Sequence, residues 1–192
     1  MCGRYITGEG IYELVIDELG IGETVFPYFP EGDINPGNFV PVITEGGYGL
    51  EFHEAFWGFP GKDSSLVINA RSESVLARPM FSASFYSRRC LVPSAGFYEW
   101  DREKNKVLFR YPDCGIMYLA AIWNLIDDIQ RFVILTTDAN DSMRPVHDRM
   151  PLLIHSEDAK LWLRDTDKAI ELMVKEMPLL MLSREADQLS FL

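Results

Sequence analysis

Two apolar runs, residues 116–123 (IMYLAAIW) and 132–136 (FVILT), indicate the fold class of this 192-residue chain. Both are rich in the β-branched, aromatic and other apolar residues that are typical of buried strands. Shorter runs of the same kind recur at residues 39–43, 50–57, 66–68, 90–92, 95–100, 107–111 and 151–154. The chain is therefore predicted to be rich in β-strands.

Helical patterns are fewer. Residues 11–19 place apolar side chains at helical spacing before Gly20, and Ser156 is expected to cap a helix that runs to about residue 163. A further helix is expected at residues 167–175, whereas Pro79 should interrupt any helix within residues 72–86. Residues 22–37 are rich in Pro and Gly and predict a long loop. The whole pattern predicts an α+β fold, with residues 1–192 forming a single domain of antiparallel β-sheets and a few flanking helices.

Composition narrows the class of protein. The net charge is −11, which argues against a broadly basic nucleic-acid-binding protein but is compatible with a local basic groove. The sequence has no apolar run long enough to span a bilayer and no recognisable secretory signal. Its three cysteines, Cys2, Cys90 and Cys114, are too few and too scattered for a disulfide framework or a zinc ribbon. We expect a cytoplasmic protein with reduced thiols.

Cys2 has a chemistry that an internal cysteine lacks. Methionine aminopeptidase removes Met1 when the next side chain is small, and Cys2 would then carry a free α-amine with a pKa of about 8 beside a thiol with a pKa of about 8.5. An aldehyde would form an imine with this amine, and the thiol on the same residue would close a thiazolidine ring. The alternative is that Cys2 is an ordinary small residue near a frayed terminus.

Three polar segments follow or interrupt strand-like runs: residues 69–73 (NARSE), 96–100 (GFYEW) and 147–151 (HDRMP). In the second segment, the carboxylate of Glu99 lies between aromatic residues, an environment that suits acid–base chemistry. Each segment also has a structural interpretation. Asn69 would cap a turn, Glu99 would face solvent from a strand, and His147 would pair with Asp148 on a loop.

Taken together, the segments resemble one family. MCGR at residues 1–4, NP at 35–36, FWG at 56–58, NARSE, RCLVP at 89–93, GFYEW and HDRMP occur in the order seen in the SRAP family of SOS response-associated peptidase-like proteins. The resemblance extends from residue 1 to about residue 163, and an ordered set of this many motifs is specific. It implies a protein that senses and shields abasic sites in single-stranded DNA through a covalent crosslink. The family also implies peptidase activity, which would be directed at the protein's own Met1.

The resemblance implies roles for four residues in this crosslinking reaction. Cys2 would be the nucleophile, and its target would be the aldehyde of the open-chain abasic sugar. Asn69 would hold the amine and backbone of Cys2. Glu99 would move protons during imine formation and exchange, and His147 would help to open the sugar ring by proton transfer to the ring oxygen.

DNA contacts are implied as well. Arg4 and Arg71 would bind the phosphates that flank the abasic site. Thr136 aligns with a polar residue that the family has at the pocket, which implies a DNA contact there. Trp57 and Trp100 would either pack in the core or stack on bases.

The resemblance implies no cofactor, and the three histidines, His53, His147 and His155, have no spacing typical of metal ligands, so we predict no metal. We expect a monomer that is associated with the nucleoid when bound to DNA. The sequence departs from the family at residues 59–65 (FPGKDSS), where the family often has an aromatic-rich loop, and at the C-terminus, where the usual Val-Asn segment is missing.

Two other classes of protein stay open at this point. Class II glutamine amidotransferases also begin Met-Cys-Gly and use the cysteine thiol against an amide, although no Asn-Gly-Asp type segment for their oxyanion site is present here. A second alternative is a binding module that holds single-stranded DNA without covalent chemistry.

Overall fold

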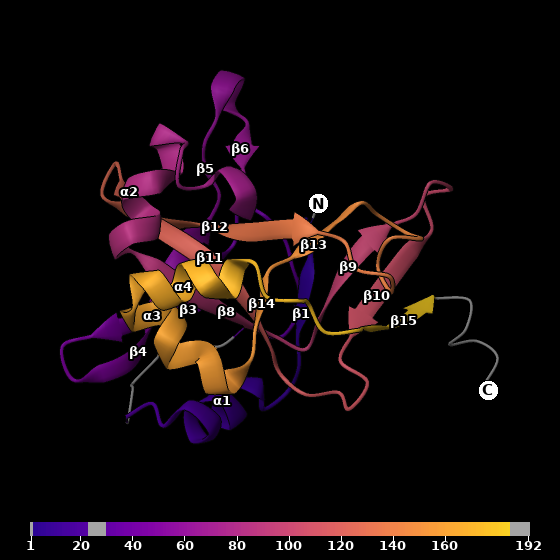
Figure 1. The fold of residues 1–192 in the computed structure, drawn as a ribbon, viewed down its shortest axis with the longest axis horizontal. Helices are drawn as coiled ribbons and strands as arrows, with labels where there is room; N and C mark the ends of the chain where they lie inside the picture. The colour runs from indigo at the N-terminus through magenta and orange to yellow at the C-terminus, as the bar shows by residue number, and fades with distance from the viewer. Residues whose placement is uncertain (1, 23–29, 185–192) are drawn as a thin grey trace.

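The computed structural model describes residues 2–22 and 30–184 (Figure 1). Met1, whose removal the sequence predicts, lies outside the described residues, as does part of the loop predicted at residues 22–37. The α-helices are α1 (Ile11–Leu19), α2 (Pro79–Ser87), α3 (Ala159–Arg164) and α4 (Thr166–Met173). The strands are β1 (Tyr5–Thr7), β2 (Gly32–Ile34), β3 (Phe39–Gly46), β4 (Gly49–Trp57), β5 (Phe59–Pro60), β6 (Leu66–Val67), β7 (Asn69–Arg71), β8 (Arg89–Ser94), β9 (Gly96–Trp100), β10 (Lys106–Arg110), β11 (Met117–Ile126), β12 (Ile129–Asp138), β13 (Arg149–Pro151), β14 (Leu153–Ile154) and β15 (Met181–Arg184).

A closed ring of strands forms the centre of the molecule. β12 pairs with β4, β4 with β3, β3 with β8, β8 with β11, and β11 again with β12, so this sheet closes into a small barrel. The two runs that indicated the fold class lie in this barrel, where residues 117–122 of the first and 132–136 of the second are buried. The predicted α+β fold with largely antiparallel sheets is confirmed. β12 departs from the antiparallel rule, because it pairs in parallel with β4 and with β7.

The barrel hairpin between β11 and β12 has a turn that its sequence explains. Asp127 and Asp128 both have positive φ, 51° and 59°, as a type I′ turn requires. Such a turn matches the right-handed twist of the two strands and sets their register, which pairs Ile126 with Ile129. The hairpin thereby fixes where β12 presents its later residues to the candidate site.

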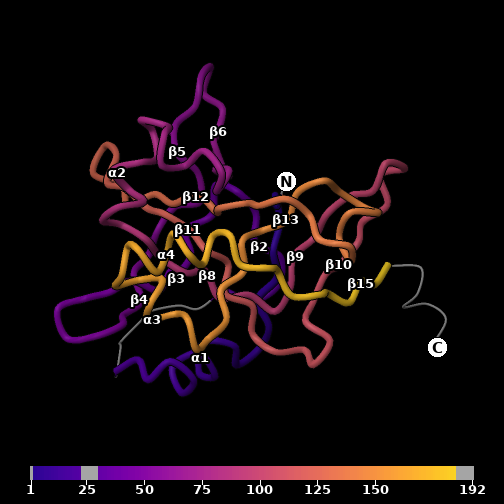
Figure 2. The backbone as a smooth tube through the Cα atoms, in the orientation of Figure 1, coloured from indigo at the N-terminus to yellow at the C-terminus, as the bar shows by residue number. Residues whose placement is uncertain are grey.

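A second sheet of five strands, in the order β15-β10-β9-β1-β2, lies beside the barrel (Figure 2). It joins the start of the described chain to its end, since β1 pairs with β9 while β15 pairs with β10. β2 falls within residues 22–37, so the prediction that this whole stretch is a loop is wrong. Its edge pairing with β1 supplies backbone hydrogen bonds that local sequence patterns do not reveal.

The helices lie outside the barrel, with α2, α3 and α4 on the side away from β9 and β10 (Figure 1). Helix α1 has the predicted bounds and ends at Gly20 in the left-handed conformation. Pro79 does not interrupt a helix but begins α2, because the first helical turn needs no N–H from that position. The cap predicted at Ser156 is also wrong: a side-chain cap forms at Asp165, whose carboxylate accepts a hydrogen bond from Lys168 N at 3.0 Å.

Candidate active site around Cys2, Glu99 and His147

Cys2 is fully buried just before β1. Its Sγ lies 3.9 Å from the carbonyl oxygen of Arg4, to which the thiol donates a weak hydrogen bond. Burial raises the pKa of the thiol well above its ordinary range, and the negative charge of Glu99 raises that pKa further. The thiol therefore holds its proton at neutral pH. The interpretation of Cys2 as part of a frayed terminus is wrong.

Glu99 projects from β9 toward the interior, with only 4% of its surface exposed. Strand alternation explains this orientation, because its neighbours Tyr98 and Trp100 are more exposed and occupy the opposite face. The interpretation of Glu99 as a solvent-facing residue is therefore wrong. The charge of this buried carboxylate acts on the Cys2 thiol.

Tyr5 completes this buried group. Its ring packs 5.3 Å from the ring of Trp57, and its hydroxyl is buried with no hydrogen-bond partner among the described residues. Burial raises the pKa of this phenol, and nearby Tyr12 and Cys2 raise it further. The sequence analysis did not single out Tyr5 as a site residue. Its position three residues after Cys2, on a strand that pairs with β9, was the available signal.

Asn69 and Arg71 lie on β7, which pairs in parallel with β12. Both side chains project from the same side of this strand, because residues two apart share a face. The side-chain oxygen and nitrogen of Asn69 are buried without a hydrogen-bond partner among the described residues. Such an amide is costly to bury alone, so it is suited to a polar group that arrives with a ligand. Trp57 holds this segment in place by donating its Nε1–H to the carbonyl oxygen of Ile68 at 3.1 Å.

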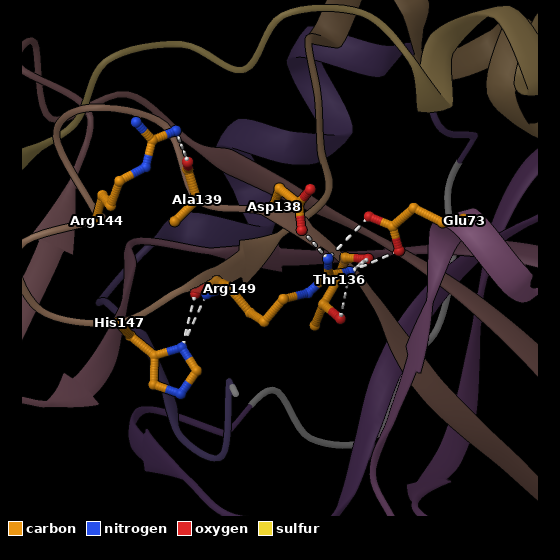
Figure 3. Close-up of polar contacts among 7 residues, drawn as sticks. All are labelled: Glu73, Thr136, Asp138, Ala139, Arg144, His147 and Arg149. Carbon is orange, nitrogen blue, oxygen red and sulfur yellow. Dashed lines mark hydrogen bonds and ion pairs between the residues drawn. The ribbon is translucent and has the colours of Figure 1, made fainter.

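Arg71 is exposed, and no ion pair to it is seen within the described part of the chain. Glu73 instead binds Arg149 through two hydrogen bonds of 2.8 Å each (Figure 3). Among the described residues, Glu73 therefore forms its ion pair with Arg149 and not with Arg71. The guanidinium of Arg71 is exposed toward solvent and can meet an anion.

Arg149, from the HDRMP segment, was missed in the sequence analysis. Its guanidinium binds the carboxylates of Glu73 and Asp138, and it donates to the carbonyl oxygen of Thr136 at 2.7 Å (Figure 3). The side chain of Arg149 is only 11% exposed, and its pKa is raised by these two carboxylates despite the opposing effect of burial. Thr136 itself is 1% exposed, so its hydroxyl faces the protein interior and this arginine.

His147 lies on the loop between β12 and β13. The backbone N–H of Arg149 donates to its Nδ1 at 2.9 Å, and the carbonyl oxygen of Arg149 lies 3.2 Å from the same nitrogen (Figure 3). The imidazole Nδ1 therefore contacts the backbone of Arg149. Since Arg149 is held by Glu73 and Asp138, the ion-pair cluster also fixes the backbone that orients the imidazole.

The structure also shows where Arg4 and Trp100 lie. Arg4 donates from Nε to Asn35 at 2.9 Å and from Nη1 to Asp33 at 3.3 Å, and its guanidinium lies 5.4 Å from the ring centroid of Trp100. Trp100 is 37% exposed, whereas Trp57 is fully buried. Of the two tryptophans, Trp100 can meet a base and Trp57 packs in the core.

The described residues contain no cluster of three or more His, Cys, Asp or Glu that could hold a metal ion. In the same residues no helix is both long enough and apolar enough to cross a membrane.

The fold and these contacts define a class of protein: a small β-barrel domain in which a buried cysteine near the start of the chain lies beside a buried glutamate. The family model of the SOS response associated peptidase (SRAP) matches residues 1–187, so this chain belongs to the SRAP family.

Individual relatives agree with this assignment. The chain is 31% identical over 180 residues to the abasic site processing protein YedK of Escherichia coli (strain K12), covering 85% of this chain and 80% of YedK. It is 29% identical over 185 residues to the abasic site processing protein YoaM of Bacillus subtilis (strain 168), covering 85% of this chain and 79% of YoaM. A crystal structure of a Bordetella bronchiseptica protein shares the fold, with a TM-score of 0.80, 18% identity, and coverage of 95% of this chain and 99% of that one.

Proposed function

We propose that this protein processes abasic sites in single-stranded DNA by forming a covalent thiazolidine crosslink through Cys2 after Met1 is removed. The observation that carries the proposal is the buried Cys2 thiol beside the Glu99 carboxylate. The names of relatives such as YedK and YoaM, which are abasic site processing proteins, support the substrate class.

The reaction begins with the closed abasic sugar, which must open to release its aldehyde. His147 is suited to this step, because the backbone of Arg149 holds Nδ1 in place and the proton for the ring oxygen can come from Nε2. The α-amine of Cys2 then adds to the aldehyde carbon. The resulting carbinolamine loses water as its hydroxyl is protonated, and an imine forms.

Ring closure follows at the imine carbon. The Cys2 thiol adds to this carbon and forms a C–S bond, while its proton passes to the imine nitrogen. Because the thiol holds its proton, this step needs a group that accepts the proton and returns it. We assign both transfers to Glu99, whose charge acts on the thiol. One water leaves overall, and no oxidant or cofactor is consumed.

The remaining site residues bind the substrate in this proposal. The buried amide of Asn69 has no partner among the described residues, so in this proposal it is available to bind the α-amine of Cys2 once Met1 is removed. Arg71 and Arg4 contact phosphates on either side of the abasic site. Thr136 acts through Arg149, which donates a hydrogen bond to the carbonyl oxygen of Thr136. Thr136 itself does not contact a phosphate in this proposal.

The test is incubation of the protein with single-stranded DNA that contains one abasic site, followed by a denaturing gel. We expect a shifted band that survives heat and denaturant, provided that mass spectrometry shows Met1 to be absent. Binding on a native gel without a denaturant-resistant band would support a non-covalent binding module instead. Mass spectrometry of wild-type and Cys2→Ala protein made in the same host reports whether Met1 removal depends on the protein's own thiol.

A further inference from the structure

The outer face of the five-stranded sheet carries a group of charged and aromatic side chains that the crosslinking chemistry does not use. On β9, alternation turns Glu99 inward and leaves Tyr98 and Trp100 on the outer face. On β10, Val107 and Phe109 are fully buried, so Lys106 and Arg110 occupy the outer face as well. The register pairs Lys106 with Trp100, which makes these outer residues neighbours across the two strands.

Tyr98 lies at the centre of this group. The Nζ of Lys106 is 3.9 Å from the centroid of its ring and 3.3 Å from Oδ2 of Asp33. Arg4 Nη1 lies 3.3 Å from the same Asp33 oxygen. Burial and the hydrogen-bonded carboxylate of Asp33 raise the pKa of Tyr98, while the positive charges of Arg110 and Arg4 act in the opposite direction. Three cations therefore surround one phenol, and Asp33 holds two of them.

Gly96 provides room for Arg110, the third of these cations. A Cβ at this position would lie 2.9 Å from Cγ of Arg110 and 2.7 Å from the carbonyl oxygen of Phe109. The absence of a side chain at Gly96 therefore leaves space that Arg110 occupies, and the charge of Arg110 acts on Tyr98. The outer face thus has a built arrangement of positive charge on a protein whose net charge is −11.

Trp100 connects this face to the candidate active site. Together with His147 it lines a hollow of about 190 Å³, and its ring lies under the guanidinium of Arg4. Its neighbour along β9 is Glu99. Trp100 thus adjoins the hollow beside His147 and, through its pairing with Lys106, the cations around Tyr98.

We propose that the outer face of the β1-β9-β10 strands binds single-stranded DNA that extends from the abasic site. A base stacks on Trp100, and phosphates contact Lys106 and Arg110, with Asp33 competing with the phosphate for Lys106. Charge complementarity and an exposed aromatic next to cations are what single-stranded nucleic acid requires. The choice of DNA as the occupant rests on the proposed function, whereas the arrangement of charges stands by itself.

The test measures binding of undamaged single-stranded DNA by fluorescence anisotropy over a series of salt concentrations, so it does not depend on crosslinking. Lys106→Gln and Arg110→Gln should each weaken binding and make the slope of log K against log salt shallower by about 0.7, one phosphate contact of a single strand. Lys106→Arg should restore the slope. Lys168→Gln, which breaks a lysine–carboxylate pair on α4, is the matched control and should leave the slope unchanged.

Asp33→Asn separates binding from mere structural support. Loss of this carboxylate releases Arg4 and Lys106 toward phosphate, so binding should become tighter and more dependent on salt. If the face were only structural, Asp33→Asn and Lys106→Gln would change stability in the same direction and leave the salt slope alone. An unchanged slope in Lys106→Gln and Arg110→Gln overturns the proposal. Failure of the crosslinking function would appear separately, as no denaturant-resistant band from wild-type protein that still binds undamaged DNA.

Discussion

At the scale of single residues, the proposed chemistry depends on where the Cys2 thiol can send its proton. Burial and the charge of Glu99 raise the pKa of this thiol, so the thiolate is scarce at neutral pH. A thiol in that state adds to an imine only when a base takes its proton in the same step. Glu99 supplies such a base within the buried group. The raised pKa is thus compatible with reaction at an imine and protects the thiol from adventitious electrophiles.

Glu99→Gln tests this relation directly. Removal of the negative charge should lower the pKa of the Cys2 thiol toward its ordinary value, so alkylation of Cys2 should begin at a lower pH than in wild type. Crosslinking should nonetheless slow by on the order of 100- to 10,000-fold, because the proton acceptor is lost. Mass spectrometry of alkylated peptides measures the first effect, with the exposed Cys114 as an internal reference. The same pH profile for Cys2 in both proteins would show that Glu99 does not act on the thiol.

The sequence predicted some of these residues and not others, for a physical reason. Glu99 could be found because a carboxylate between aromatics in a strand is locally unusual. The partners of Arg149 could not be predicted from the sequence, since its ion pair with Glu73 joins residues 76 positions apart. The Lys106–Asp33 contact spans 73 positions in the same way. Long-range pairs of charged residues leave no periodic signal in a sequence.

At the scale of secondary-structure elements, β9 brings the inner and outer sites together, and Gly96 at its start is the position where the packing is tightest. Gly96→Ala places a Cβ against the backbone of β10, which cannot move without loss of strand pairing. We expect the free energy of unfolding to fall by roughly 1–3 kcal/mol, as overpacking does. Urea denaturation of wild type and Gly96→Ala measures this difference in the free energy of unfolding. Gly47→Ala, at a site with no atom within 4 Å of the added Cβ, is the control and should change stability little.

The Glu73–Arg149 pair links β13 to the segment after β7. Burial alone would raise the pKa of Glu73, but the hydrogen bonds and charge of Arg149 outweigh it and hold this pKa below its ordinary value of 4.5. A lowered carboxyl pKa contributes stability above the unfolded value, and that contribution is lost as the pH falls through the folded value. Glu73 is partly exposed, so we expect the pair to be worth about 1 kcal/mol or less.

Glu73→Gln should therefore be less stable than wild type at neutral pH and equally stable in acid. Urea denaturation at a series of pH values from 7 down through the acid range measures the difference in the free energy of unfolding. Glu54→Gln, which changes an exposed carboxylate on β4, should show no such pH-dependent difference. A difference for Glu73→Gln that persists undiminished in acid would show that the ionised carboxylate is not what stabilises this junction.

Local sequence patterns predicted most elements where the local signal was strong. Residues 11–19 became α1 with the predicted bounds, because apolar spacing and a C-terminal glycine agree there. The parallel pairing of β7 with β12 was not predicted, since it depends on barrel closure between distant segments. Pro79 was misread because the same residue that breaks a helix interior also begins one. These errors fall at boundaries and pairings that tertiary contacts decide.

At the scale of the whole molecule, the charge distribution sets how the protein meets DNA. The net charge of −11 repels a polyanion at a distance, so productive encounters depend on local cations such as Arg71 and Lys106. Binding should accordingly weaken as the salt concentration rises, and the slope of log K against log salt should correspond to only a few phosphate contacts. In the proposed function, the covalent bond retains DNA that the surface alone would hold weakly.

The central claim, that the α-amine and thiol of Cys2 act together, is tested most directly with one protein in three forms. The processed form, the form that retains Met1 and processed Cys2→Ser are incubated with abasic single-stranded DNA, and the denaturant-resistant band is quantified. We predict a stable crosslink for the processed form alone, because Met1 converts the amine to an amide and serine closes the ring poorly. Borohydride should trap an imine with Cys2→Ser at most. Equal crosslinking by the form that retains Met1 would contradict the thiazolidine mechanism and point to the thiol alone or to a lysine.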